Sequence, residues 1–164
     1  MNKSILAICS FAALAGACVT DGMSSPRQAE AGRIDLASDA AGAQGLRPLG
    51  DAALPDKSCG MILWTLEGVR PAAVFRFVSG KEAEINIAGQ PVMLTRTAQD
   101  GAAGFGVFER QVFESEDGVT VEVSARFGLG FDGGAYLEKG LIKVRDDQGW
   151  SMVAPTAGIA GCKN

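Results

Sequence analysis

Short runs in which apolar and polar residues alternate dominate the sequence from Cys59 to the end of the chain. This alternation, with glycine-containing links between the runs, is typical of antiparallel β structure, because successive side chains of a strand point to opposite faces of the sheet. No stretch of helical periodicity competes with it. We therefore expect strands over Met61–Leu66, Ala73–Val78, Ala83–Ala88, Pro91–Thr97, Phe105–Ser115, Val119–Phe127, Ala135–Arg145 and Trp150–Val153.

The segment Val119–Phe127 carries the clearest pattern of a half-buried strand. Its valines and Ala125 occupy alternate positions and would face the core, while Glu122 and Arg126 would face solvent. The preceding Asp117-Gly118 step favours a tight hairpin, because both residue types tolerate a positive φ. The strand before this turn and the strand after it are therefore predicted to pair.

Small residues define the other links. Gly128–Gly134 is expected to form a glycine-rich, mobile crossing, Gly140 to form a β-bulge, and Pro155–Cys162 to be coil or an edge strand. About eight strands at this spacing predict an all-β domain, namely a small antiparallel eight-stranded barrel or sandwich of meander type. The expected core aromatic residues are Trp64, Phe75, Phe77, Phe108, Phe127 and Trp150.

The first residues have the three parts of a bacterial export signal in order. Lys3 is followed by an apolar run too short to span about 30 Å of hydrocarbon as a helix. The run ends at Leu14-Ala15-Gly16-Ala17-Cys18, which resembles the lipobox of bacterial lipoprotein precursors. This resemblance implies cleavage before Cys18, a diacylglycerol on its sulfur and acylation of the new amino group. The alternative is an ordinary secretory signal, cut after the Ala15-Gly16-Ala17 triplet.

The chain has four cysteines. Cys9 leaves with the signal and Cys18 takes the lipid, so Cys59 and Cys162 remain to form a disulfide in an oxidising compartment. Such a bond would join the two ends of the domain; two unpaired buried thiols are the alternative. We accordingly expect a signal over residues 1–17, a lipidated flexible tether over 18–58 and a β domain over 59–164.

The expected tether contains no aromatic residue between Val19 and Ser58 and is rich in Ala, Gly, Asp, Ser and Pro, which favours a flexible chain. Leu46–Leu49 and Leu54-Pro55 nevertheless set apolar residues among prolines, so this part could dock along the domain or along a partner. It resembles the extended, proline-bearing amino-terminal segment of a lipoprotein in the outer-membrane β-barrel assembly machinery. That resemblance implies an accessory subunit of an envelope assembly machine.

Composition excludes several classes of function. The net charge is −4 with no clustered basic patch, which argues against nucleic acid and against anionic lipid headgroups as partners. The chain has no histidine, which removes Ser-His and Cys-His nucleophiles and the usual zinc sites. We expect no enzyme activity, no cofactor and no metal. The acidic residues of the expected turns lack the spacing of a calcium loop; they are Glu114, Glu116, Asp117, Asp146 and Asp147.

Three residues are candidates for partner binding: Phe131, Tyr136 and Lys139. Phe131 lies at the tip of the glycine-rich crossing, where it would either contact a partner or fold back to cap the barrel. Arginines on successive strands are expected to point outward and to form cross-strand ion pairs with nearby glutamates. They are Arg76, Arg96, Arg110 and Arg126, beside Glu84, Glu109 and Glu122.

A cysteine before the first strand and another near the carboxyl end of a small β domain resemble the membrane-bound inhibitors of c-type lysozyme. Ala83–Leu94 corresponds to a strand, a short turn and a leucine-bearing strand of that family, and Lys139-Gly140 to part of its Trp-x-Lys-Gly run. Gly101–Phe105 lacks the tyrosine of the family's other inhibitory loop. The resemblance implies a β domain of this size and, as an alternative function, inhibition of a lysozyme-type hydrolase.

These observations together predict a non-enzymatic outer-membrane lipoprotein whose domain binds a protein or glycan partner of the cell envelope. Val19 and Thr20 follow Cys18 in place of the aspartate that retains many lipoproteins in the inner membrane, so the outer membrane is expected. The domain would face the periplasm or the cell surface. Its contact with the membrane would be made through the lipid anchor.

Replacing the cysteine of the lipobox-like segment tests the anchor. The Cys18→Ser protein should gain no acyl chain, because no other residue of this segment offers a thiol for the diacylglycerol. Metabolic labelling with an alkyne fatty acid and intact-mass analysis measure this directly. A wild-type product of unmodified mass, released freely from the cell envelope, would contradict the prediction.

Overall fold

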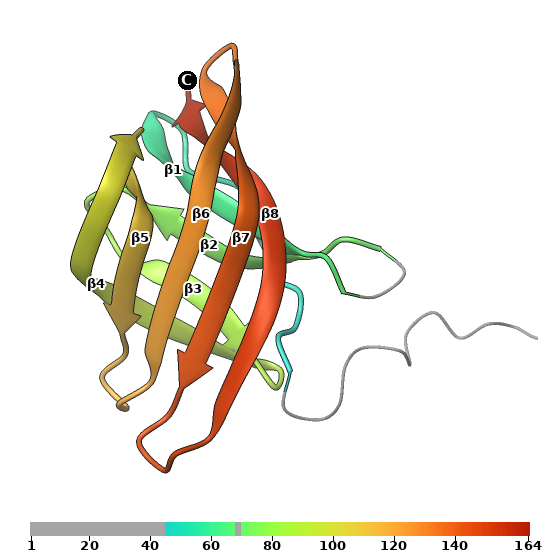
Figure 1. Ribbon diagram of the computed structural model, residues 1–164, viewed down its shortest axis with the longest axis vertical. Coiled ribbons are helices and arrows are strands. Elements are labelled where there is room, and N and C mark those ends of the chain that lie inside the picture. The colour runs from blue at the N-terminus through green and yellow to red at the C-terminus, as the bar shows by residue number, and fades with distance from the viewer. Residues whose placement is uncertain (1–44, 68–69) are drawn as a thin grey trace, which may run out of the picture. The chain divides into compact units, whose positions relative to one another are not determined.

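The computed structural model describes residues 45–67 and 70–164, so the expected signal, Cys18 and most of the expected tether lie outside the described residues. Eight strands make up the structure. Their bounds are β1 Ser58–Thr65, β2 Ala73–Val78, β3 Ala83–Ile87, β4 Gln90–Gly104, β5 Val107–Glu114, β6 Thr120–Phe131, β7 Gly134–Arg145 and β8 Ser151–Lys163. All of them belong to one sheet (Figure 1).

The sheet closes on itself. Each strand pairs antiparallel with the next, and β8 pairs with β1 over the whole length of β1, from Ser58↔Lys163 to Thr65↔Thr156. The predicted all-β, eight-stranded meander is confirmed, and of the two architectures considered it is the barrel. Closure leaves neither β1 nor β8 with a free row of backbone donors and acceptors, since each uses the other's edge.

The predicted disulfide is present. Cys59 and Cys162 face each other in the β1–β8 ladder, with an S–S distance of 2.01 Å and a sequence separation of 103 positions. Because alternate turns of a meander lie at opposite ends, the β2–β3, β4–β5 and β6–β7 turns share one end of the barrel with this bond. We call it the disulfide end.

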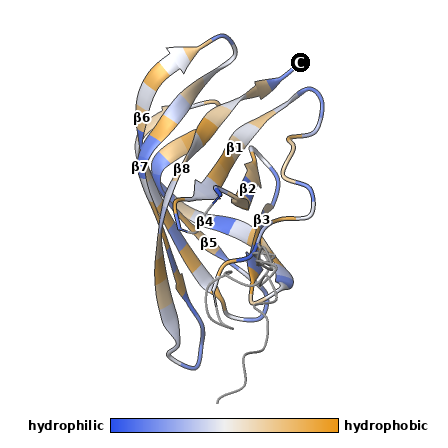
Figure 2. Cartoon of the chain, turned by 90° about the vertical axis from the view of Figure 1, so that its right-hand side faces the viewer, coloured by the Kyte–Doolittle hydropathy of each residue, from blue (hydrophilic) through white to orange (hydrophobic). Residues whose placement is uncertain are grey.

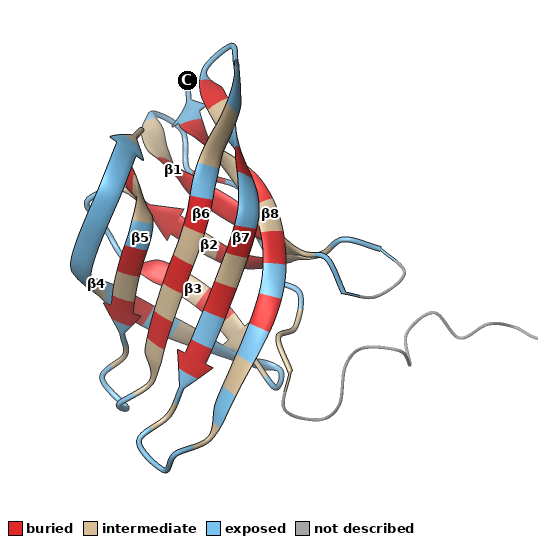
Figure 3. Ribbon diagram, viewed as in Figure 1, coloured by how far each residue is buried: buried red, intermediate tan, exposed pale blue. Residues whose placement is uncertain are grey.

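The barrel interior is filled by the inward residues of every strand, as the alternation of buried and exposed positions in Figure 3 shows. Phe113 lies at its centre, with Phe75 and Phe77 edge-on to it at ring-centroid distances of 5.2 Å. Hydropathy alternates along the strands in the same way (Figure 2). In β6, Val121, Val123 and Ala125 are buried as predicted.

Three strands extend further than the sequence pattern indicates. β4 continues to Gly104, β6 continues through the expected glycine-rich crossing to Phe131, and β8 runs to Lys163 where coil or an edge strand was expected. These extensions consist of small residues that show little hydrophobic alternation, but backbone hydrogen bonding does not require it. In β8 the small residues also allow close approach, since a Cβ at Gly158 would collide with the carbonyl oxygen of Ile62.

The predicted bulge at Gly140 is confirmed, because the β7–β8 register shifts between Leu137 and Gly140. Lys139 takes a positive φ of 51° at this shift. A side chain at Gly140 would collide with Thr156 of β8, so glycine is required where the two strands are closest. The bulge thereby presents Lys139 on the outside of the barrel, where it is exposed.

Residues 45–57 lie along the barrel. Leu46 bridges to Ile87 of β3, and the backbone NH of Leu49 donates to the carbonyl of Ala73 at 2.8 Å. Leu54 is buried against Ile62 and Val78 on the outer face. This segment was expected to dock either along the domain or along a partner, and in the structure it docks along the domain.

Removing the disulfide should destabilise the barrel. The Cys59→Ser/Cys162→Ser protein is expected to lose about 2–5 kcal/mol of unfolding free energy, because the bond closes a long loop of the unfolded chain. Urea unfolding under non-reducing conditions measures the loss, and Cys18→Ser is the matched control for loss of a cysteine that takes no part in this disulfide. An unchanged unfolding midpoint would contradict a stabilising role.

Candidate functional site

The β6–β7 hairpin projects from the disulfide end of the barrel (Figure 1). Its last pairs are Gly130↔Ala135 and Phe131↔Gly134, and the turn between them has Gly133 at a φ of 81°. The segment expected to be a mobile crossing is therefore a paired hairpin with a two-residue turn. The hairpin fixes the positions of the side chains near its tip.

Two of the candidate contact residues meet on this hairpin. The rings of Phe131 and Tyr136 lie 5.2 Å apart, tilted by 55° to one another. Gly134 makes room for this pair, since a Cβ there would collide with the Phe131 ring. The structure answers the question left open for Phe131: it stays exposed beside Tyr136 and does not fold back as a cap over the core.

A third residue of this hairpin, Leu129, was not predicted from the sequence to be a contact residue. It is 78% exposed, compared with 41% for Phe131 and 52% for Tyr136. We refer to Leu129, Phe131 and Tyr136 as the hairpin cluster. The signal was present in the sequence, because an apolar side chain between two glycines has few neighbours to bury it, but the expected loop gave no position for it.

The third candidate contact residue, Lys139, lies apart from the aromatic pair at the bulge of β7. Glu138 beside it covers Gly128 of β6, where a Cβ would collide with the carboxylate. Lys139 takes part in none of the ion pairs found among the described residues. Its ammonium group therefore remains exposed on the same strand as Tyr136.

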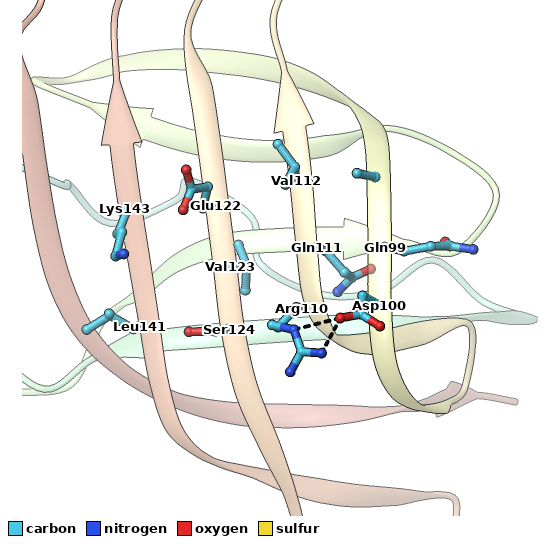
Figure 4. A pocket seen from close by; sticks show the side chains of 11 residues that line it. Gln99, Asp100, Arg110, Gln111, Val112, Glu122, Val123, Ser124, Leu141 and Lys143 are labelled. Atoms are coloured by element: carbon cyan, nitrogen blue, oxygen red, sulfur yellow. Dashed lines mark hydrogen bonds and ion pairs between the residues drawn. The ribbon is translucent and has the colours of Figure 1, made fainter.

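A groove of about 360 Å³ crosses the outer face of β4–β7 (Figure 4). Apolar residues form much of its lining, including Ala98, Val112 and Leu141. Arg110 reaches across its edge to Asp100, donating from Nε at 2.9 Å. This hydrogen bond holds the pKa of Asp100 below its ordinary value, helped by the backbone NH of Gly101. The groove thus has an apolar floor and a charge-balanced rim.

The prediction that arginines on successive strands point outward and form cross-strand ion pairs is correct only in part. Arg76 pairs with Glu84 at 2.6 Å, as expected from neighbouring strands. Arg110 pairs with Asp100 and not with one of the expected glutamates. Glu122 does form an ion pair, but its partner is Arg145, which was not among the expected arginines. Charged side chains on the outer faces of adjacent strands choose among several partners, which sequence spacing alone does not rank.

Arg96 is where the outward assignment was wrong. It follows Val92 and Leu94 at alternate positions of β4, and its guanidinium lies over the buried Phe77 ring at 4.8 Å. Nη1 donates to Gln111 Oε1 at 2.8 Å and to the carbonyl oxygen of Gly106 at 2.9 Å. Alternation places Arg96 inside the barrel, and its length lets the charged end reach the β4–β5 turn.

The acidic turns have structural roles. Asp146 Oδ1 accepts hydrogen bonds from the backbone NH groups of Gln148 and Trp150, which builds the β7–β8 turn. Glu114, Glu116 and Asp117 line a separate cavity of about 200 Å³ near the β5–β6 turn. Across residues 45–67 and 70–164, no group of three or more Cys, Asp or Glu side chains is arranged to hold a metal ion.

Comparisons of the chain with protein-family models, with curated proteins and with solved structures found no match. In the part of the chain that the structure describes, no helix has the length and apolar character needed to cross a membrane.

The Arg110–Asp100 pair gives a pH-dependent signal at the groove. Arg110→Ala should raise the pKa of Asp100 toward its ordinary value, because the guanidinium hydrogen bond is the main cause of the lowered pKa. In the wild type the pair persists as pH falls through the ordinary aspartate range and is lost when pH passes the lowered pKa. Carboxyl ¹³C NMR titration measures both curves; coincident curves would contradict the pairing.

Proposed function

We propose that this protein is a non-enzymatic outer-membrane lipoprotein whose barrel binds a protein or glycan partner in the periplasm through the β6–β7 hairpin. The observation that carries the proposal is the hairpin cluster, in which Leu129, Phe131 and Tyr136 expose apolar surface on a projecting, well-paired hairpin. Large exposed apolar side chains held close together are typical of contact sites, and aromatic residues contribute strongly to binding.

Closure of the sheet restricts how a partner can bind. A peptide cannot add a strand beside β1 or β8, because each of these strands uses the other's edge. We expect the partner to contact side chains on the outer face, in the groove or at the disulfide end. Tyr136 offers both an aromatic face and a hydroxyl group, which suits either a protein surface or a sugar ring.

The position of the amino-terminal segment supports a partner as the hairpin's target. The backbone carbonyl of Gly45 accepts from the NH of Ala88, in the β3–β4 turn at the end opposite the disulfide. Gly45, the first residue that the structure describes, therefore lies at the end opposite the hairpin cluster. A lipid on Cys18 would be connected to the described barrel at that opposite end, through Gly45.

Inhibition of a lysozyme-type hydrolase remains a second proposal, favoured by the exposed Lys139 beside Gly140 in the β7 bulge. It is tested by whether the purified protein slows lysis of bacterial cell walls by c-type lysozyme. An accessory role in an envelope assembly machine gains no specific support, since Leu46 and Leu54 pack on the barrel of the same chain.

Crosslinking in intact cells tests the proposed contact surface. With a photoreactive amino acid at position 135, the wild-type hairpin should form adducts that are identified by mass spectrometry. Leu129→Ser/Phe131→Ser/Tyr136→Ser should reduce their yield by about tenfold or more, because removal of central aromatic contacts commonly costs more than 1 kcal/mol each.

The matched control is Val153→Ser on β8, which removes an apolar side chain of similar exposure (55%) away from the hairpin. It should leave the adducts unchanged. Equal yields in the triple variant and in the wild type, with both folded, would show that the hairpin cluster is not the contact surface.

A further inference from the structure

A cationic side chain lies inside the barrel near the disulfide end. The guanidinium carbon of Arg96 is 4.8 Å from the ring centre of Phe77 and 5.5 Å from that of Phe108. Phe77 is fully buried, and Arg96 itself is half-buried. The two aromatic rings thus flank the guanidinium group, which remains partly exposed to solvent.

The hydrogen bonds of Arg96 leave one edge of the guanidinium unused. Both hydrogens of Nη1 are committed, one to Gly106 O and one to Gln111 Oε1. Nε and Nη2 donate to no atom of residues 45–67 or 70–164 that lies within hydrogen-bonding distance. Their three N–H groups include the parallel pair that binds a carboxylate through both oxygens.

The charge of Arg96 has no acidic partner in the described part of the chain. None of the four ion pairs found among the described residues includes Arg96. Burial alone lowers the pKa of Arg96 from its ordinary value, with no contribution from a nearby carboxylate. The arginines that do form ion pairs, Arg76, Arg110 and Arg145, lie on the outer face. Arg96 therefore differs from them both in position and in having no ion pair.

The neutral contacts of Arg96 do not require a positive charge. Gln111 is buried, and its amide nitrogen already contacts the sulfur of Met61, so its oxygen needs one donor. A neutral amide could supply that donor without the cost of partly desolvating a cation. Cation–π contacts with two rings offset part of this cost. An anion bound to the Nε and Nη2 groups would neutralise the charge of Arg96.

We propose that the disulfide end of the barrel binds a carboxylate group at the free Nε–Nη2 edge of Arg96, with Arg96 as the bidentate partner and Phe77 and Phe108 beside it. Gln111 positions the guanidinium by holding Nη1. The carboxylate comes either from a small free acid or from an acidic side chain or chain terminus of a protein that contacts this end. Both sources share the chemistry that Arg96 recognises.

The direct test is a titration of the full-length protein with sodium acetate against sodium chloride at equal ionic strength. The arginine Nε–Hε NMR signals report each guanidinium separately. Arg96 should show a saturable shift with acetate only, whereas the exposed Arg126 and the paired Arg110 should not saturate. A response of Arg96 that is linear, or that is the same with chloride, would overturn the proposal.

Two variants separate charge from folding. Arg96→Gln retains an amide donor for Gln111 but removes the charge, and it should abolish the increase in melting temperature that acetate gives the wild type. Arg126→Gln is the matched control and should keep that increase. If Arg96→Gln unfolds, Arg96→Lys tests the same point, since it keeps the charge, loses the bidentate edge and should bind acetate at least several-fold more weakly.

The source of the carboxylate is distinguished in cells. Loss of hairpin crosslinks in Arg96→Gln together with acetate binding by the wild type indicates a partner's carboxylate. Retained crosslinks together with acetate binding indicate a small acid. The acetate titration needs no partner, so its failure is independent of any failure of the proposed hairpin contact.

Discussion

Closure of the sheet between β1 and β8 is the constraint on which the rest of the structure depends. This ladder joins the first and last strands of the domain, which are far apart in sequence, and it is crosslinked by Cys59–Cys162. Because long-range pairing carries a large entropic cost, a covalent bond at one end of the ladder is placed where it contributes most. The small residues of β8 allow the two strands to approach within the barrel.

The closed sheet determines where binding can occur. Because β1 and β8 occupy each other's edges, we expect recognition through turns, the outer face or the disulfide end. The long β6–β7 hairpin extends beyond the closed ladder and carries apolar side chains into solvent. At the same end, Arg96 brings a charge into the interior, where hydrogen bonds with Gln111 and Gly106 hold it. Two distinct kinds of surface thus occur at one end of one barrel.

Sequence alone could predict most of the fold. Val119–Phe127 shows strict alternation, Asp117-Gly118 marks its turn, and the paired cysteines mark the two ends of the domain. The pattern could not predict that Pro155–Cys162 closes the barrel, because its small residues show little contrast between faces. Backbone pairing with β1 and β7 on both sides determines that strand instead.

The candidate site was less predictable, for a related reason. Phe131 and Tyr136 were candidates for partner contact from the sequence, but the exposure of Phe131 was left open, and the contact between the two rings depends on the hairpin register and on Gly134. Arg96 was assigned by its charge to the outer face, although its alternation with Leu94 pointed inward. The position of Arg96 in the strand, and not its charge, determines that its side chain points inward, because Phe77, Gln111 and Gly106 supply contacts there.

Native-state hydrogen exchange of the β8 amides tests the closed barrel most directly. As β8 lies between β1 and β7, the amides of residues 157–161 should exchange only through global unfolding, with the same free energy as the amides of β5 and β6. Exchange of this segment at a much lower free energy, while β5 and β6 remain protected, would show that the sheet is open at β8 and would contradict the account.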